Sequence, residues 1–256
     1  MNKFEPSISD PPATPGDGRR QPSMLEVTGL HAAYGQAAIL FDVGLQVSSH
    51  EVVALIGRNG AGKSTTLKSI AGLLAPKQGE IRFEGQQIGG LEPFMIARRG
   101  LGYVPEDRRI FKELTVLENL EVGRLRHRSG HAAWAPERLF ELFPNLAERR
   151  FNRAGGLSGG EQQMLTIART LMGNPKAILL DEPSEGLAPI IIDKIAETIL
   201  DLRASGMAIV LCEQNMHFAS AVAERVYIIE KGHIRHEGSM AGLLENEELC
   251  ATYLAL

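Results

Sequence analysis

The stretch EVVALIGRNGAGKST, residues 51–65, joins a strand signal, a glycine-rich turn and the start of a helix. Residues 51–57 are β-branched and nearly all apolar, which predicts a buried parallel strand. Residues 57–64 match the pattern GxxxxGK[ST] in full. Apolar residues then recur at helical spacing and predict a helix over residues 64–74. A glycine loop between a buried strand and a helix indicates a phosphate-binding loop.

The residues of this loop suit a nucleotide. Glycines let successive backbone N–H groups turn toward phosphate oxygens, and the N-terminus of the following helix adds a favourable dipole. Lys63 can reach the β- and γ-phosphates, and the Ser64 hydroxyl can ligate Mg²⁺. We therefore expect ATP and Mg²⁺ as cofactors. The predicted nucleotide-binding residues of the loop are Gly57, Arg58, Asn59, Gly60, Ala61, Gly62, Lys63, Ser64 and Thr65.

A second signal is the sequence AILLDE, residues 177–182. Its apolar residues predict a core strand, and two carboxylates follow at the carboxyl end, where open α/β sheets bind ligands. We expect Asp181 to hold Mg²⁺ together with Ser64. Glu182 is placed to orient or deprotonate the attacking water, so Glu182 and Lys63 are predicted catalytic residues.

A third signal is LSGGEQQ, residues 157–163, followed by an amphipathic helix. Ser158, with the exposed amides of Gly159 and Gly160 at a helix N-terminus, makes a second anion-binding end. One chain then has two phosphate-binding surfaces about a hundred residues apart in sequence. A single ATP accounts for both only if two protomers sandwich it.

The rest of the sequence predicts one α/β unit with two additions. Residues 24–49 alternate at period two and predict antiparallel strands, and residues 81–88 predict a further β element. Residues 108–172 read mostly as helices, a helical insert. After Pro175, strands and helices alternate as in a parallel sheet. Residues 1–22 hold five prolines and predict a flexible tail, with the folded unit over residues 23–256.

Composition narrows the class of protein. Apolar residues make up 44% and charged residues 23% of 256, and 27 Lys and Arg against 31 Asp and Glu give a net charge of −4. This acidic balance argues against a chain that coats nucleic acid. We expect no transmembrane segment, because no apolar run approaches about 18 residues, and no signal peptide. The two cysteines lack metal-binding spacing and predict reduced thiols.

Together these motifs, in this order and spacing, resemble the nucleotide-binding subunits of ABC transporters over residues 24–256. The resemblance implies an α/β fold of the P-loop NTPase type with a mainly parallel core sheet, an N-terminal antiparallel β-subdomain and an inserted helical subdomain. It implies a head-to-tail dimer in which Ser158 of one cassette completes the ATP site of the other. It also implies that Tyr34 stacks on adenine, and that membrane subunits press on the loop around Glu106.

The chain departs from the general family pattern at two positions near the nucleotide. Glu106 replaces the usual Gln, and Gln214 replaces the usual His. The Gln214 amide can still donate to the γ-phosphate, which makes it a predicted catalytic residue, but it cannot carry a positive charge. An ionised Glu106 can bind Mg²⁺ or water more strongly than Gln, so we count it among the cofactor and metal ligands.

These departures occur together in the branch that resembles the ATPases of branched-chain and hydrophobic amino-acid importers. That resemblance implies a second, different cassette, two membrane permeases and, indirectly, a periplasmic solute-binding protein. It places the chain at the cytoplasmic face of the inner membrane as a peripheral subunit. Alternatives are an importer of urea or amides, a lipopolysaccharide exporter, and a soluble ABC ATPase acting on nucleic acid or ribosomes. One cassette without coiled-coil inserts or zinc-binding Cys pairs argues against the last.

Overall fold

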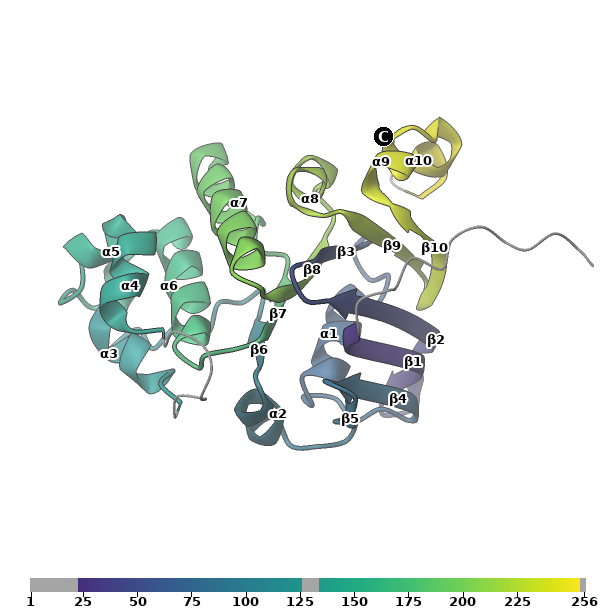
Figure 1. Ribbon diagram of the computed structural model, residues 1–256, viewed down its shortest axis with the longest axis horizontal. Helices are drawn as coiled ribbons and strands as arrows, with labels where there is room; N and C mark the ends of the chain where they lie inside the picture. Colours follow the sequence, from purple (N-terminus) through teal and green to yellow (C-terminus); the bar gives the residue numbers. More distant parts are fainter. Residues whose placement is uncertain (1–22, 126–133, 254–256) are drawn as a thin grey trace, which may run out of the picture.

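Two β-sheets form the framework of the computed structural model, which describes residues 23–125 and 134–253 (Figure 1). The larger sheet has the strand order β10-β9-β3-β8-β7-β6. Its strands are β3 (Val52–Ile56), β6 (Leu101–Val104), β7 (Ala177–Asp181), β8 (Ala208–Glu213), β9 (Arg225–Glu230) and β10 (His233–Ser239). The five strands from β9 to β6 run parallel, and β10 pairs antiparallel with β9. The mainly parallel core sheet is thereby confirmed.

The smaller sheet is antiparallel and has the order β2-β1-β4-β5. Its strands are β1 (Ser23–Tyr34), β2 (Ala37–Ser48), β4 (Gln78–Phe83) and β5 (Gln86–Gln87). The predicted antiparallel region is confirmed, and its residues form the two long strands β1 and β2. The predicted tail, residues 1–22, lies outside the described residues.

Helices cover both faces of the larger sheet and form a group of their own at one side (Figure 1). They are α1 (Lys63–Ile70), α2 (Pro93–Arg99), α3 (Val116–Val122), α4 (Pro136–Leu142), α5 (Pro144–Glu148), α6 (Gly159–Leu171), α7 (Pro189–Ala204), α8 (Met216–Val222), α9 (Met240–Leu244) and α10 (Glu247–Tyr253). Helices α3 to α6 form that side group, which corresponds to the expected helical insert. None of the helices within the two described ranges has the length and apolar character needed to cross a membrane.

The larger sheet separates two apolar cores. Val52, Ala54 and Ile56 of β3 pack into the core that includes α6, α7 and α8. Val53 and Leu55 of the same strand pack into the core shared with α1 and the antiparallel sheet. Because side chains of a strand alternate between faces, a strand with a core on each side must be apolar throughout. This explains the unbroken apolar run that begins the nucleotide motif.

The sequence analysis missed two elements and predicted one helix to be longer than it is. Helix α2 and the four-residue strand β6 were not predicted. Helix α1 ends at Ile70 rather than near residue 74, because Gly72 takes a left-handed conformation with φ of 76°. A Cβ at Gly72 would lie 2.5 Å from the carbonyl oxygen of Leu91, so the backbones approach too closely for another residue.

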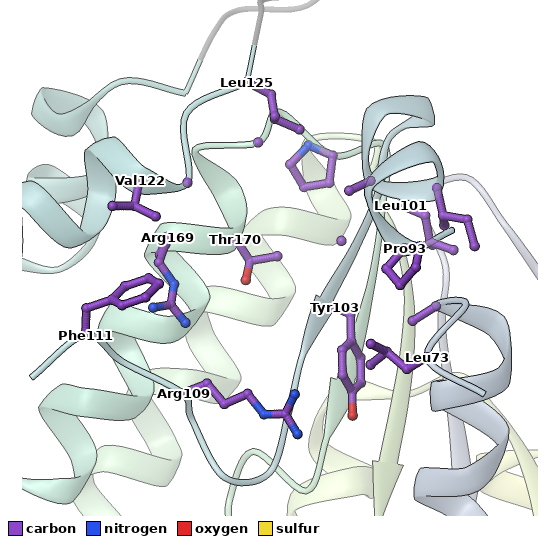
Figure 2. A pocket seen from close by; sticks show the side chains of 17 residues that line it. Leu73, Pro93, Leu101, Tyr103, Arg109, Phe111, Val122, Leu125, Arg169 and Thr170 are labelled. Atoms are coloured by element: carbon purple, nitrogen blue, oxygen red, sulfur yellow. The ribbon is translucent and has the colours of Figure 1, made fainter. Parts of the chain in front are cut away.

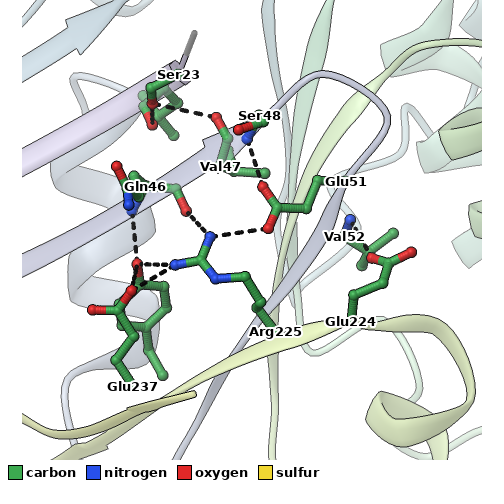
Figure 3. A network of polar contacts seen from close by, with 11 residues as sticks. Ser23, Gln46, Val47, Ser48, Glu51, Val52, Glu224, Arg225 and Glu237 are labelled. Carbon is green, nitrogen blue, oxygen red and sulfur yellow. Dashed lines mark hydrogen bonds and ion pairs between the residues drawn. The ribbon is translucent and has the colours of Figure 1, made fainter. Parts of the chain in front are cut away.

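A polar network joins the antiparallel sheet to the C-terminal strands (Figure 3). The Arg225 guanidinium donates to Glu51 Oε1 over 2.9 Å and to Glu237 Oε1 over 2.6 Å. Tyr227 OH lies 2.8 Å from Arg225 Nη2 and accepts from the backbone N–H of Gln46 over 3.2 Å. Since Gln46 belongs to β2 and Glu237 to β10, Arg225 connects segments far apart in sequence.

We predict that Arg225→Met destabilises the protein by about 1–3 kcal/mol, because it leaves the partly buried Glu51 carboxylate without its cation and removes the bonds to Glu237 and Tyr227. Arg82→Met is the matched control. Arg82 pairs with Glu80 at the exposed surface, and its loss changes stability by at most about 0.5 kcal/mol. Urea unfolding of both full-length variants measures the difference. Equal stability of the two variants contradicts a linking role for Arg225.

Candidate functional site

The predicted functional residues converge at the carboxyl ends of β3, β7 and β8, which are neighbours in the larger sheet. The glycine loop follows β3, Asp181 and Glu182 end β7, and Gln214 follows β8. Parallel strands bring their carboxyl ends to one edge, so the glycine loop meets two segments that lie more than a hundred residues further along the chain. The parallel topology therefore builds the site.

The glycine loop has the backbone that a phosphate cradle requires. Gly60 has φ of 79°, and no atom lies within 4 Å of the position that a Cβ would take, so the loop is open on that side. Gly57 is restricted for a different reason, because a Cβ there would lie 2.3 Å from the Ile229 carbonyl oxygen. The N–H of Gly232, in the turn between β9 and β10, donates to Ala61 O over 2.8 Å and supports the loop from behind.

The Lys63 ammonium is buried, with 3% of the residue exposed. It donates to Gly57 O over 2.7 Å and to Arg58 O over 3.3 Å, and it pairs with Glu182 Oε1 at 2.9 Å. Glu182 is also buried, at 7% exposed. The two predicted catalytic residues are therefore in direct contact, and the carboxylate balances a charge that would be costly to bury alone.

Ser64 and Asp181 form the predicted magnesium-binding pair. Ser64 Oγ donates to Asp181 Oδ1 over 2.9 Å. Burial raises the pKa of Asp181, and the hydrogen bonds from Ser64 and Tyr103 act in the opposite direction. Within the described part of the chain, no three His, Cys, Asp or Glu side chains are grouped to hold a metal ion. A hydroxyl and a carboxylate beside a phosphate cradle fit Mg²⁺, which takes one or two protein oxygens and completes its shell with phosphates and water.

Tyr103 is a site residue that the sequence analysis missed. Its OH donates to Asp181 Oδ2 over 3.0 Å, so both carboxylate oxygens of Asp181 have a partner. Burial and the neighbouring Asp181 raise the pKa of Tyr103, which keeps its OH protonated as a donor. Its strand, β6, pairs with β7 in parallel register. The only sequence signal was a tyrosine three residues before Glu106.

Gln214 contacts the other oxygen of the predicted base. Its Nε2 lies 3.4 Å from Glu182 Oε2, while Lys63 holds Oε1. The backbone of Glu182 has a left-handed φ of 46°, and its N–H donates to Cys212 O on β8 over 3.0 Å. The predicted catalytic set of Lys63, Glu182 and Gln214 is thus assembled within one chain.

Glu106 is exposed and faces the loop after Glu182. It shares a hydrogen bond with Glu185. Burial is the largest cause of the raised pKa of Glu106, and the negative charges of Glu185 and Glu182 raise this pKa further. Its nearest partner is therefore a second carboxyl group, and its predicted role as a nucleotide and metal ligand remains a prediction.

The remaining predicted contacts lie elsewhere in the chain. Ser158 is the N-cap of α6: its Oγ accepts from Glu161 N, and the Glu161 carboxylate accepts from Ser158 N. Gly159 and Gly160 begin that helix, which lies on the far side of β6 from α1 (Figure 1). Tyr34 ends β1 and is 49% exposed. Their predicted roles depend on a nucleotide and on a second cassette.

A groove of about 470 Å³ lies beside the site, between α2 and the helical side group (Figure 2). Arg169 and Phe111 form one wall, and Tyr103 and Pro93 form the other (Figure 2). The Arg169 guanidinium lies 5.2 Å from the Phe111 ring centre, and its Nη1 is buried with no hydrogen-bond partner among the described residues. Burial lowers the pKa of Arg169. Arg169 Nη2 donates to Arg108 O over 3.3 Å, but no carboxylate among the described residues pairs with this guanidinium.

This chain is similar to known proteins in sequence and in fold. Residues 40–185 match the family model described as ABC transporter. The high-affinity branched-chain amino acid transport ATP-binding protein BraG of Pseudomonas aeruginosa is 45% identical, over 90% of this chain and 99% of its own. The lipopolysaccharide export system ATP-binding protein LptB of Haemophilus influenzae is 37% identical, over 91% and 97%. A solved dimeric bacterial ABC transporter cassette is 26% identical, with a TM-score of 0.74 over 85% of this chain and 99% of that one.

These similarities extend over the strands, the glycine loop and the helical side group that carry the site. The P-loop fold and the ABC cassette architecture expected from the sequence are confirmed. So is the resemblance to the branched-chain amino-acid subfamily. The chain belongs to the ABC transporter family as an ATP-binding cassette that hydrolyses ATP.

Proposed function

We propose that this chain is the ATP-hydrolysing subunit of an importer for branched-chain or other hydrophobic amino acids. The assembly of Lys63, Glu182 and Gln214 beside the Ser64–Asp181 pair carries the ATPase part of the proposal. Similarity to BraG, greater than that to LptB, supports the amino-acid cargo. The similarity to LptB favours a second candidate, an ATPase that drives lipid export.

In this proposal the backbone amides of residues 57–65 hold the ATP phosphates, with Tyr34 against the adenine. Ser64 and Asp181 hold Mg²⁺, which neutralises the developing charge on the phosphates. Tyr103 keeps Asp181 oriented through its hydrogen bond. A phosphate oxygen replaces Glu182 as the partner of Lys63, because the buried ammonium can pair with either anion. Glu182, released from Lys63, then accepts the proton of the attacking water.

Each cassette supplies half of a complete site. Ser158, Gly159 and Gly160 form a helix N-terminus suited to a phosphate, but their helix belongs to the side group away from the chain's own glycine loop. Two cassettes arranged head to tail bring this end against the nucleotide of the partner. We expect the partner to be a second, different cassette, as in amino-acid importers.

The groove is the proposed contact for one of the two membrane permeases, at the cytoplasmic face of the inner membrane. Its apolar walls suit an amphipathic helix, and Nη1 of Arg169, which has no hydrogen-bond partner among the described residues, suits a carboxylate on that helix. Tyr103 lines the groove and also donates to Asp181, so an occupant contacts a residue that is hydrogen-bonded to the magnesium pair. A periplasmic solute-binding protein completes the importer on the other side, and no nucleic acid takes part.

The test of hydrolysis is Glu182→Gln, which keeps the shape of the side chain but removes the base. We expect ATP binding to be retained and the hydrolysis rate to fall about 100-fold or more. Phosphate release by the complex of this chain with its partner cassette measures the rate, and Glu197→Gln on the exposed face of α7 serves as control. A normal rate for Glu182→Gln shows that Glu182 is not the catalytic carboxylate.

The cargo is tested with the complex of both cassettes, its permeases and their binding protein, reconstituted in vesicles. ATP-dependent uptake of leucine, lost with Glu182→Gln, is the expected result. Uptake of urea in place of leucine, or extraction of lipopolysaccharide, contradicts the amino-acid proposal and identifies the alternative.

Reversing the charge in the groove tests the membrane contact. We expect Arg169→Glu to lower recovery of the co-expressed permeases with the tagged chain by about tenfold or more, because it faces the partner's carboxylate with a like charge. Arg235→Glu, on the exposed β10, is the matched control. Equal recovery for both variants shows that the permeases bind elsewhere.

A further inference from the structure

Glu213, the last residue of β8, is a buried carboxylate that the proposed mechanism does not use. Only 1% of the residue is exposed. Its Oε1 accepts from the backbone N–H of Ser184 over 3.1 Å. Its Oε2 accepts from the backbone N–H of Gln214 and of Asn215, each over 3.2 Å. One side chain therefore holds the backbone of two separate segments.

Burying a carboxylate costs free energy unless hydrogen bonds replace the water that it loses. Burial raises the pKa of Glu213, and its hydrogen bonds with Ser184 and Asn215 act in the opposite direction. The next strand along the chain, β9, also ends in a glutamate, Glu230, but that side chain is only half-buried and pairs with Arg235. Among the described strands, β7 also ends in a buried carboxylate, Asp181, but Asp181 belongs to the proposed magnesium pair whereas Glu213 has no such role.

The two segments held by Glu213 lie on either side of Glu182. Ser184 is two residues after Glu182 on the same loop. Gln214 places its Nε2 3.4 Å from Glu182 Oε2. Asn215 caps α8 by accepting from Phe218 N over 3.1 Å, so the Gln214 segment is fixed at its other end by a helix. The distance between Gln214 and Glu182 therefore depends on the carboxylate that ties their backbones together.

We propose that Glu213 is a positioning residue: it fixes the backbone of Gln214 to the loop of Glu182, so that the Gln214 amide stays in reach of both Glu182 and the γ-phosphate. The inference rests on the proposed roles of Glu182 and Gln214, and it is independent of the transported solute. Glu213 itself touches neither nucleotide nor water. It acts through the position of Gln214.

Glu213→Gln tests this with little change of shape. The amide has one acceptor oxygen and places an NH₂ group against a backbone N–H donor, so one of the two segments loses its partner. We expect kcat to fall about tenfold or more, because the reacting geometry is lost, and KM for ATP to rise about fivefold, because the Gln214 amide also contacts the γ-phosphate of bound ATP. Glu230→Gln is the matched control at the end of β9 and leaves both constants unchanged.

Two further readouts separate positioning from a merely structural role. In a Gln214→Ala background, Glu213→Gln is expected to add less than about twofold to the loss of kcat, because both changes act through the same side chain. By equilibrium binding, Glu213→Gln weakens a non-hydrolysable ATP analogue about fivefold or more but leaves ADP affinity unchanged, since only ATP has the γ-phosphate that Gln214 contacts. The binding readout needs no turnover.

The outcomes are distinct. An unchanged kcat, effects that multiply in the double variant, or equal weakening of ADP and the ATP analogue each overturn the inference. If Glu213→Gln does not fold, Glu213→Asp keeps the buried charge with a shorter reach and is expected to show the same split between ATP and ADP. Failure of leucine uptake by the wild-type complex contradicts the proposed function without affecting these results.

Discussion

The ion pair between Lys63 and Glu182 is the contact on which the rest of the site depends. Both side chains are buried, and their atoms approach to 2.9 Å. Removing one partner of such a pair costs about 3–5 kcal/mol, because the other charge is left without compensation. A nucleotide phosphate is an alternative anion for Lys63. When a phosphate takes the place of Glu182 beside Lys63, the Glu182 carboxylate becomes available as a base. ATP binding and the release of the base are thereby linked.

The parallel sheet makes that pair possible. Register between β3, β8 and β7 aligns their carboxyl ends, and the apolar residues of each strand fill a core on both faces. The next strand, β6, carries Tyr103, which donates a hydrogen bond to Asp181. The same strand lines the groove that we assign to the permeases. The chemical site and the proposed membrane contact thus share one edge strand, which gives a short physical route between them.

The sequence was informative where function depends on a local pattern. The glycine loop, the carboxylates after β7 and the Ser158 helix start are contiguous motifs, and the apolar run before the loop predicted a buried strand. Tyr103 and Glu213 could not be assigned in this way, because their roles come from contacts between segments about 80 and 30 residues apart in sequence. Strand β6 has only four residues and too little periodicity to detect. Glu213 had one signal, a carboxylate ending an apolar strand as Asp181 does.

The central claim is that ATP is held between two cassettes, by Lys63 of one and Ser158 of the other. The most direct measurement is the ATPase rate of the complete complex with Ser158→Arg, which blocks the helix N-terminus while leaving the chain's own glycine loop intact. The account predicts a loss of about 100-fold in turnover with ATP still bound. An unchanged rate contradicts it and leaves each cassette with a self-sufficient site.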